Sequence, residues 1–122
     1  SVDMILLSLI IHHLHYAEEE GEAMPARSAD IYADFRRVLK PGGVFAIIEH
    51  KAADGSSRAE SAGWHRIPEA TMKADVMSAG FEFDGSADEI HSNPDDDLRN
   101  VWYETGLTGK TTRLVHRYKS PD

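Results

Sequence analysis

The sequence predicts an α/β fold, because two apolar runs flank one helical pattern. Met4 to Ile11 is nearly continuous in Leu and Ile, and Val44 to Ile48 is a second apolar run. Runs without alternation are typical of strands that are covered on both faces in a parallel sheet. A short buried helix is the alternative for the first run. The order strand, helix, strand predicts parallel neighbours that are joined by a right-handed crossover.

The helix between these strands is predicted to run from Ser28 to Lys40. Ser28 is a good N-cap, and Pro41-Gly42-Gly43 ends the helix in a turn. The preceding stretch, Ala17 to Arg27, contains four glutamates and is typical of a solvated loop or a frayed helix. Apolar residues recur along one face of the helix, at Ile31, Phe35, Val38 and Leu39.

A long loop and a second helix are predicted after the second strand. Lys51 to Gly63 is rich in Ala, Ser and Gly and has no periodicity, which is typical of a loop. The helix begins with Pro68 at its first position and stops at Gly80. Its apolar face is expected to contain Met72, Val76 and Ala79, and its exposed face an ion pair of Glu69 with Lys73.

Two short strands are predicted in the last third of the chain. Phe81 to Phe83 alternates like the start of a strand, and Thr112 to Tyr118 alternates with Leu114, His116 and Tyr118 on one face. Ser92 to Asp97 is predicted to be a surface loop. Gly106 to Thr111 resembles a phosphate loop only superficially, because its two glycines are closer together than the required spacing, and we interpret it as a turn.

Composition limits the classes of protein to which the chain can belong. Its 122 residues are enough for one domain, spanning residues 1–122. A net charge of −8 argues against a protein that binds the nucleic-acid backbone, and the longest apolar run, Val2 to Ile11, is too short to span a membrane. The absence of cysteine excludes disulfides and Cys-type zinc sites and favours a cytoplasmic protein. Because the chain opens directly in apolar residues, we expect it to be a fragment.

Histidines gather where the first two predicted strands end. His12, His13 and His15 directly follow the first strand, and Glu49 and His50 end the second. Ligands of open α/β sheets bind at the carboxyl ends of the strands, so these two groups are predicted to converge. A histidine there needs only a near-neutral pKa and reach to a substrate proton to act as a general base. Histidines of a strand-to-helix turn without any ligand are the alternative interpretation.

Other conspicuous residues carry less information. The histidine cluster lacks the spacing of a known metal motif, so no metal ligand is assigned. The acidic runs Glu18 to Glu22 and Asp95 to Asp97 are interpreted as solvated surface, and the latter lacks EF-hand spacing. Trp64 and Trp102 fit either a core or a lid.

Two segments resemble class I S-adenosylmethionine-dependent methyltransferases. They are Asp3 to Leu7 and Phe35 to His50. The second segment contains the motif RVLKPGG followed by apolar residues. In that family an Asp opens the fourth strand, and this motif marks the helix and turn into the fifth. The remainder resembles a bacterial subgroup of predicted methyltransferases of unassigned substrate, through Gly55-Ser56, His65-Arg66-Ile67, Ala79-Gly80-Phe81, Asn93-Pro94-Asp95-Asp96 and Gly109-Lys110-Thr111.

The resemblance implies a partial Rossmann-like methyltransferase sheet with flanking helices. The family has seven strands in the order 3-2-1-4-5-7-6, and this chain would supply about four, ordered 4-5-7-6, with the last strand antiparallel. The family's glycine-rich loop after strand one and its acidic residue after strand two, which grip S-adenosylmethionine, have no counterpart in the sequence. The implied catalytic candidates are His12, His13, Glu49, His50 and His65, and the implied cofactor contacts are Ser8, Leu9 and His15.

Two functions are therefore expected. In the first, the chain is the acceptor-side half of a methyltransferase that uses S-adenosylmethionine, and it is inactive alone because the main donor-binding elements are missing. In the second, it is a non-catalytic, dimeric α/β binding or interaction module. The strand Met4 to Ile11 would lie at a sheet edge, so we expect a homodimer through it that buries at least about 1,000 Å². Neither nucleic acid nor a membrane is an expected partner.

Overall fold

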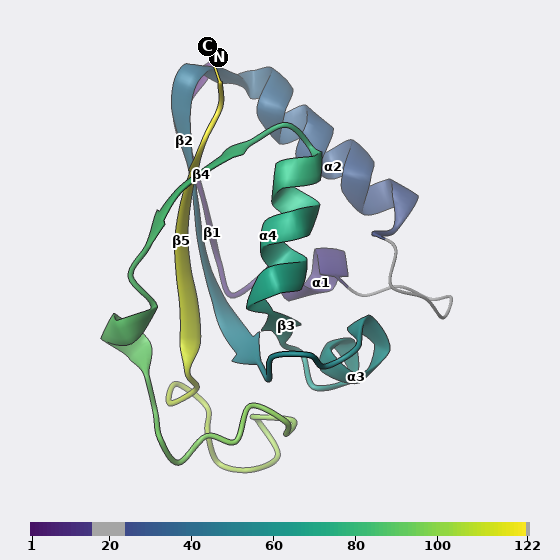
Figure 1. The fold of residues 1–122 in the computed structure, drawn as a ribbon, viewed down its shortest axis with the longest axis vertical. Helices are drawn as coiled ribbons and strands as arrows, with labels where there is room; N and C mark the ends of the chain where they lie inside the picture. Colours follow the sequence, from purple (N-terminus) through teal and green to yellow (C-terminus); the bar gives the residue numbers. More distant parts are fainter. Residues whose placement is uncertain (16–23, 122) are drawn as a thin grey trace.

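The computed structural model describes residues 1–15 and 24–121, which form a mixed sheet with helices packed on it (Figure 1). The sheet order is β1 (Val2–Ser8), β2 (Leu39–Ala52), β5 (Arg113–Lys119), β4 (Glu82–Ser86). β1 and β2 are parallel, whereas β5 is antiparallel to both β2 and β4. The predicted fold class, strand order and antiparallel last strand are confirmed. A two-residue strand, β3 (Ile67–Pro68), also pairs with the end of β2.

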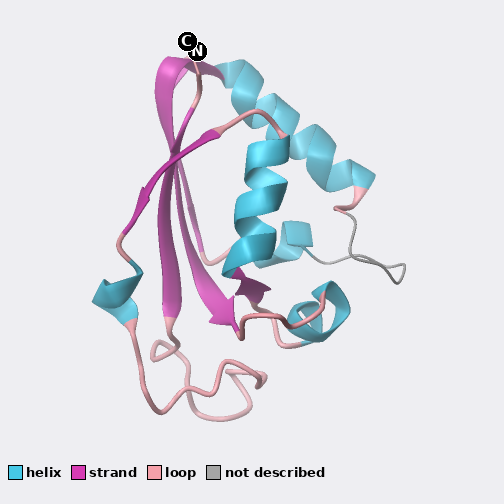
Figure 2. Ribbon diagram, viewed as in Figure 1, coloured by secondary structure: helices cyan, strands magenta, loops and turns pink. Residues whose placement is uncertain are grey.

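Two longer helices, α2 (Ala26–Val38) and α4 (Glu69–Ser78), pack against one face of the sheet (Figure 2). Tyr32 of α2 and Met72 of α4 are buried in the same cluster as Phe45 and Ile47 of β2. The short elements are α1 (His12–His15), α3 (Arg58–Gly63) and the 3₁₀-helix η1 (Asp88–His91). No helix in the described part of the chain is long and apolar enough to cross a bilayer.

β1 differs from the prediction of a strand covered on both faces. It ends at Ser8 rather than Ile11, and Leu9 follows with a positive φ of 61°. Val2, Met4 and Leu6 expose 43%, 53% and 55% of their surface. The reason is that the described helices cover one face of the sheet, so that only alternate residues of β1 point into the core. The short-helix alternative for this run is wrong, because helix begins only at His12.

The first long helix begins and ends earlier than predicted. α2 starts after Pro25, so that Ser28 is a helical residue and not the N-cap; its hydroxyl donates to the Leu14 carbonyl at 2.6 Å. Pro41-Gly42-Gly43 does not form a separate turn, because β2 already begins at Leu39. The extra residues form an irregularity in the pairing with β1, where Gly42 has a φ of 77°. The predicted loop or frayed helix of residues 17–27 lies largely outside the described residues.

Lys51 to Gly63 is only partly a loop. β2 continues to Ala52, and α3 is a six-residue helix that begins with a capping box between Ser57 and Glu60. This helix has no apolar periodicity, and the S-x-x-E spacing was the signal that could have revealed it. The second helix matches the prediction within one residue. The predicted pair of Glu69 with Lys73 is wrong, because the Lys73 ammonium lies 4.0 Å from the Phe83 ring centroid.

Candidate functional site

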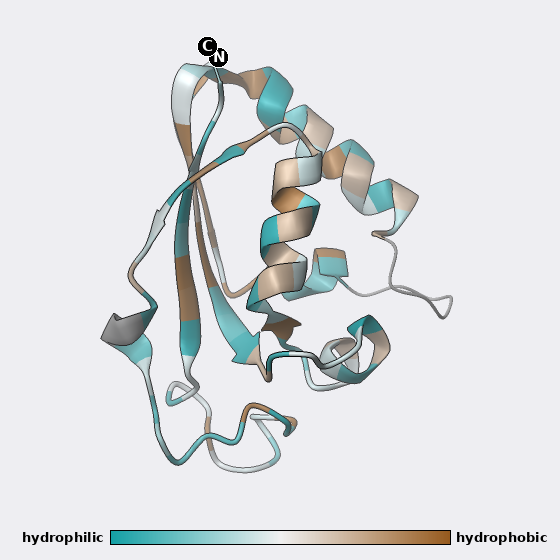
Figure 3. Cartoon of the chain, viewed as in Figure 1, coloured by the Kyte–Doolittle hydropathy of each residue, from teal (hydrophilic) through white to brown (hydrophobic). Residues whose placement is uncertain are grey.

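The candidate site lies at the carboxyl ends of β1 and β2, where Figure 3 shows β2 changing from apolar to hydrophilic residues. Ser8 pairs with Ile48, which brings α1 directly beside the end of β2. The ring centroid of His12 lies 4.3 Å from that of His13, 5.8 Å from that of His50 and 5.9 Å from that of His65. The structure therefore brings these four histidines together.

Glu49 is the fully buried centre of this group. Its carboxylate accepts from the backbone N–H groups of His12 and His50, both at 2.8 Å, and its Oε1 lies 2.7 Å from His12 Nδ1. A carboxylate only accepts hydrogen bonds, so Nδ1 of His12 carries a proton and donates it to Oε1 of Glu49, while Nε2 is not part of this hydrogen bond. A carboxylate that orients an imidazole in this way prepares a general base.

His50 is held as a neutral ring under the indole of Trp102. The two rings stack with centroids 4.3 Å apart, and His50 Nδ1 lies 2.6 Å from the Thr111 hydroxyl. Burial lowers the pKa of His50 to about 4, so its ring is uncharged near neutral pH. Burial and the neighbouring His12 also lower the pKa of His13, although His13 is exposed.

His65 connects the histidines to an aromatic wall. Its ring centroid lies 5.3 Å from that of Tyr103, and its carbonyl accepts from the Trp102 indole N–H at 3.2 Å. His65 has a φ of 55° and Leu9 a φ of 61°, so the group is bordered by two non-glycine residues in the left-handed region. Such strained residues cluster at functional sites.

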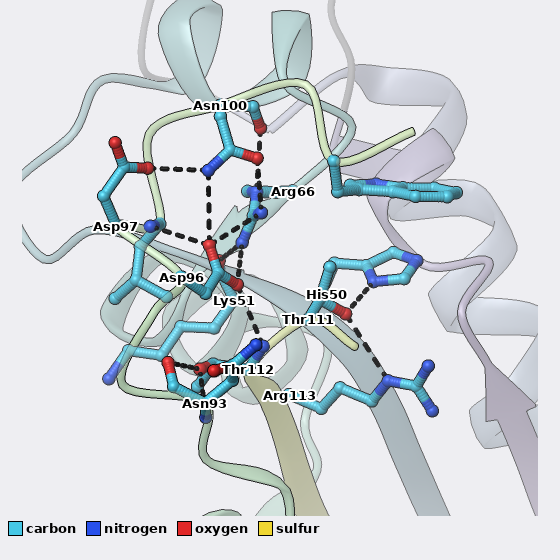
Figure 4. A network of polar contacts seen from close by, with 12 residues as sticks. His50, Lys51, Arg66, Asn93, Asp96, Asp97, Asn100, Thr111, Thr112 and Arg113 are labelled. Carbon is cyan, nitrogen blue, oxygen red and sulfur yellow. Dashed lines mark hydrogen bonds and ion pairs between the residues drawn. The ribbon is translucent and has the colours of Figure 1, made fainter. Parts of the chain in front are cut away.

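A buried ion pair fixes the loop that carries the aromatic wall (Figure 4). The guanidinium of Arg66, which has no exposed surface, makes two 2.9 Å hydrogen bonds to Asp96. It also donates to the Lys51 carbonyl and to the side chain and carbonyl of Asn100. Asp96 accepts in addition from the backbone of Thr112. Arg66 thus ties residues 93–112 to the end of β2.

Sequence reasoning missed this anchoring and left Trp102 open between core and lid. The structure places Trp102 over the histidines as one wall of the site. No spacing rule connects Arg66 with Asp96, thirty residues later. The sequence predicted only a surface loop at Ser92 to Asp97 and a turn at Gly106 to Thr111, and neither prediction names a partner for Arg66.

The three predicted cofactor contacts occupy different surroundings. Ser8 is exposed at the end of β1, and the Leu9 N–H donates to the Ile48 carbonyl at 2.7 Å. His15 has no exposed surface; its Nε2 bonds the Ser61 hydroxyl, and its Nδ1 faces Arg58, which is paired with Asp75. Ser8 and Leu9 can reach a ligand, whereas His15 lies in a polar network inside the fold.

The buried histidines predict a loss of stability in mild acid. Burial, and secondly the charge of Arg58, lower the pKa of His15 to about 3, whereas its unfolded value is 6.5. Because the folded pKa is the lower one, this stabilisation is complete above pH 6.5 and is lost as pH falls towards 3. His15 alone should remove about 2 kcal/mol from the free energy of unfolding between pH 6.5 and pH 5.

Urea denaturation at pH 7.5, 6.5, 5.5 and 5.0 measures this loss. His15→Gln keeps a donor near Ser61 but does not titrate, so the slope of stability against pH should be smaller in this variant. Equal slopes of stability against pH in the wild-type protein and in His15→Gln would show that His15 does not cause the loss of stability in acid.

Comparison with known proteins finds solved structures that are similar to this chain, but no similar protein by sequence. No family model matches the chain, and no curated protein matches it at a significant level. A chain of the complex between the Haloferax volcanii Trm112 methyltransferase activator and a methyltransferase matches with a TM-score of 0.60 and 16% identity. The [4+2]-cyclase SpnF matches with a TM-score of 0.59 and 16% identity. An S-adenosylmethionine-dependent methyltransferase from Mesorhizobium loti matches with a TM-score of 0.55 and 16% identity.

These matches cover 98% to 100% of this chain but only 55%, 49% and 62% of the three other chains, in the same order. The chain therefore spans about half to two thirds of the length of these proteins. At such low identity the likeness shows the fold, which is a methyltransferase-like α/β fold. A cyclase among the matches illustrates that this fold carries more than one chemistry.

Proposed function

We propose that the chain forms the acceptor side of an S-adenosylmethionine-dependent methyltransferase, with His12 as its general base. The observation that carries this proposal is the pair formed by buried Glu49 and His12 at the carboxyl ends of two parallel strands. This is the edge at which open α/β sheets bind ligands. The methyltransferase-like fold supports the choice of reaction.

The proposed step is a methyl transfer with proton removal. S-adenosylmethionine would supply the methyl group, and Nε2 of His12 would take the proton that an O–H or N–H acceptor loses. Glu49 holds the ring by Nδ1 and stabilises the imidazolium that forms, as a carboxylate does for other catalytic histidines. His13, Glu49, His50 and His65 complete the proposed acceptor pocket.

The residues around His12 fit part of the cofactor. S-adenosylmethionine supplies an electrophilic methyl group on a sulfonium cation, and cations are attracted to aromatic faces such as those of Trp102 and Tyr103. Ser8 and Leu9 line the strand end beside this group. The glycine-rich loop and the acidic residue that grip the cofactor in the resembling family are missing from the sequence. We therefore propose weak binding and no turnover by this chain alone, in keeping with a cytoplasmic half of an enzyme.

Titration with S-adenosylhomocysteine, followed through the histidine ring protons by NMR and by calorimetry, tests the proposal. At millimolar ligand we expect saturable shifts for His12, His13 and His65, with His91 and His116 unchanged as internal controls. His12→Asn is the sharpest variant, because its amide N–H replaces Nδ1–H towards Glu49 while Nε2 is lost. His12→Asn should still bind S-adenosylhomocysteine, and only the ring-proton shifts of the histidines next to residue 12 should change.

The tautomer of His12 gives a second test. In the wild-type protein the ¹⁵N shifts should report a proton on Nδ1, which the hydrogen bond to Glu49 requires. Absence of any saturable shift at 5 to 10 mM ligand, on the order of the weakest specific affinities, would contradict the proposal.

A second function, a non-catalytic dimeric module, is favoured by the edge of the sheet. In the described residues, β1 pairs only with β2, and Val2, Met4 and Leu6 are exposed beside the unpaired edge. Unpaired edges with apolar side chains are templates for association. We propose that two copies pair through this edge.

Leu6→Lys is expected to abolish this dimer while the chain stays folded, because Leu6 is 55% exposed and lysine blocks edge pairing. Light scattering after size exclusion measures the mass of both proteins at micromolar concentration. Met77→Lys, at an exposed site on α4, is the matched control and should remain dimeric. A monomeric wild-type chain would reject the dimer.

A further inference from the structure

Three potential metal ligands converge outside the histidine group, each from a different element. Glu69 begins α4, Asp88 begins η1, and His116 lies in β5. His116 Nε2 lies 3.1 Å from Glu69 Oε2 and 3.6 Å from Asp88 Oδ2, and the three ligand atoms all lie within 4.8 Å of one another. Nothing in the sequence pattern linked these residues, since 19 to 28 positions separate successive members.

The surroundings orient these ligand atoms. His116 is almost fully buried, and its other ring nitrogen, Nδ1, lies 2.9 Å from the Tyr118 hydroxyl. One oxygen of Asp88 accepts from the Val115 N–H at 2.6 Å, which leaves the second oxygen towards His116. A ligating histidine typically has its remote nitrogen held by such a hydrogen bond. The group is thus built into the fold and is more than a set of exposed carboxylates.

Both carboxyl groups face the same ring nitrogen, Nε2 of His116, from two different elements. One ligand atom from each of the three side chains therefore lies around a common point. A divalent cation at that point would attract both carboxylates at once.

We propose that Glu69, Asp88 and His116 bind one divalent transition-metal ion, such as Mn²⁺ or Zn²⁺. Ligands at bond lengths of about 2.0–2.2 Å from one ion are separated by about 3.0–3.5 Å, close to the two distances to His116 Nε2. An imidazole with two carboxylates favours Mn²⁺, Fe²⁺ or Zn²⁺ over Ca²⁺ and Mg²⁺.

The ion would keep open coordination positions on the solvent side. The side chains of Glu69 and Asp88 are 41% and 25% exposed, so water can reach the three ligands from this side. Because the three ligands come from α4, η1 and β5, the ion would tie these elements together.

Titration of the purified protein with Mn²⁺, followed by electron paramagnetic resonance of the free ion, tests the site. One ion should bind per chain and raise the melting temperature. Glu69→Gln should weaken binding about tenfold or more, since even the loss of a supporting partner costs that much. Glu69 is partly exposed, so this variant is expected to fold, which its circular dichroism spectrum checks. His116→Gln should have the same effect.

Two controls separate this site from the histidine group and from general surface charge. His13→Gln and Glu82→Gln, both at exposed positions, should leave the affinity for Mn²⁺ unchanged. The proposed site is wrong if Glu69→Gln and the wild-type protein bind Mn²⁺ with equal affinity. It is also wrong if the wild-type protein binds no Mn²⁺ with a Kd below about 1 mM, on the order of the weakest specific affinities. Loss of binding in His13→Gln alone would instead assign the ion to the histidine group and overturn the proposal.

Discussion

Arg66→Met is expected to lower the free energy of unfolding by about 3–5 kcal/mol, because it leaves the buried carboxylate of Asp96 without its partner. The guanidinium is fully buried and makes five hydrogen bonds, to Asp96, Asn100 and the Lys51 carbonyl. Methionine fills much of the volume but satisfies none of these acceptors. A loss of this size is a large share of the total stability of a small domain. Urea denaturation at pH 7.5 measures it.

The same substitution should release the loop that covers the histidines. Trp102 stacks on His50, so the ring protons of His50 are shifted by the indole and report the position of the loop. In Arg66→Met these shifts should move towards those of a free histidine. The double variant Arg66→Met with Asp96→Asn is the matched control, because it removes the unpaired charge. It should recover part of the stability, and equal stabilities of the single and double variants would contradict this account.

Glu49→Ala is expected to cost about 3–5 kcal/mol, because it leaves three donors at the site without an acceptor. They are the N–H groups of His12 and His50 and the Nδ1–H of His12. Glu49 has no exposed surface, so water cannot easily take its place. Glu49→Gln keeps the size and one acceptor, and its cost should be smaller, about 2 kcal/mol. Chemical denaturation of the three proteins gives both values.

Glu49→Ala should also change the tautomer of His12. In the wild-type protein the carboxylate holds the proton on Nδ1, whereas free histidine prefers Nε2–H, and ¹⁵N shifts distinguish the two forms. Two results would contradict this role of Glu49 as the acceptor that orients His12. One is an unchanged His12 tautomer in Glu49→Ala. The other is a free energy of unfolding within about 1 kcal/mol of wild type, which is the size of one ordinary hydrogen bond.

Local patterns in the sequence were sufficient for the four main strands and the two longer helices, whereas the order of the strands in the sheet was implied by the family resemblance and the short helix α3 was missed. The apolar runs, the amphipathic pattern before RVLKPGG and the alternation at Leu114, His116 and Tyr118 each depend on neighbours within a few residues. The convergence of His12 and His13 with Glu49 and His50 could also be predicted, because parallel strands end at the same edge of a sheet. Their catalytic role stays a prediction.

Contacts between distant segments decided the rest. Arg66 selects Asp96 and Asn100, Trp102 covers His50, and Glu69 meets Asp88 and His116, yet none of these partners is marked by a local spacing. The burial of β1 on only one face likewise depends on where α2 and α4 pack. A buried charge needs a partner, but which of several distant carboxylates supplies it is settled by the packing of the whole chain, because only the folded backbone brings them within hydrogen-bond reach.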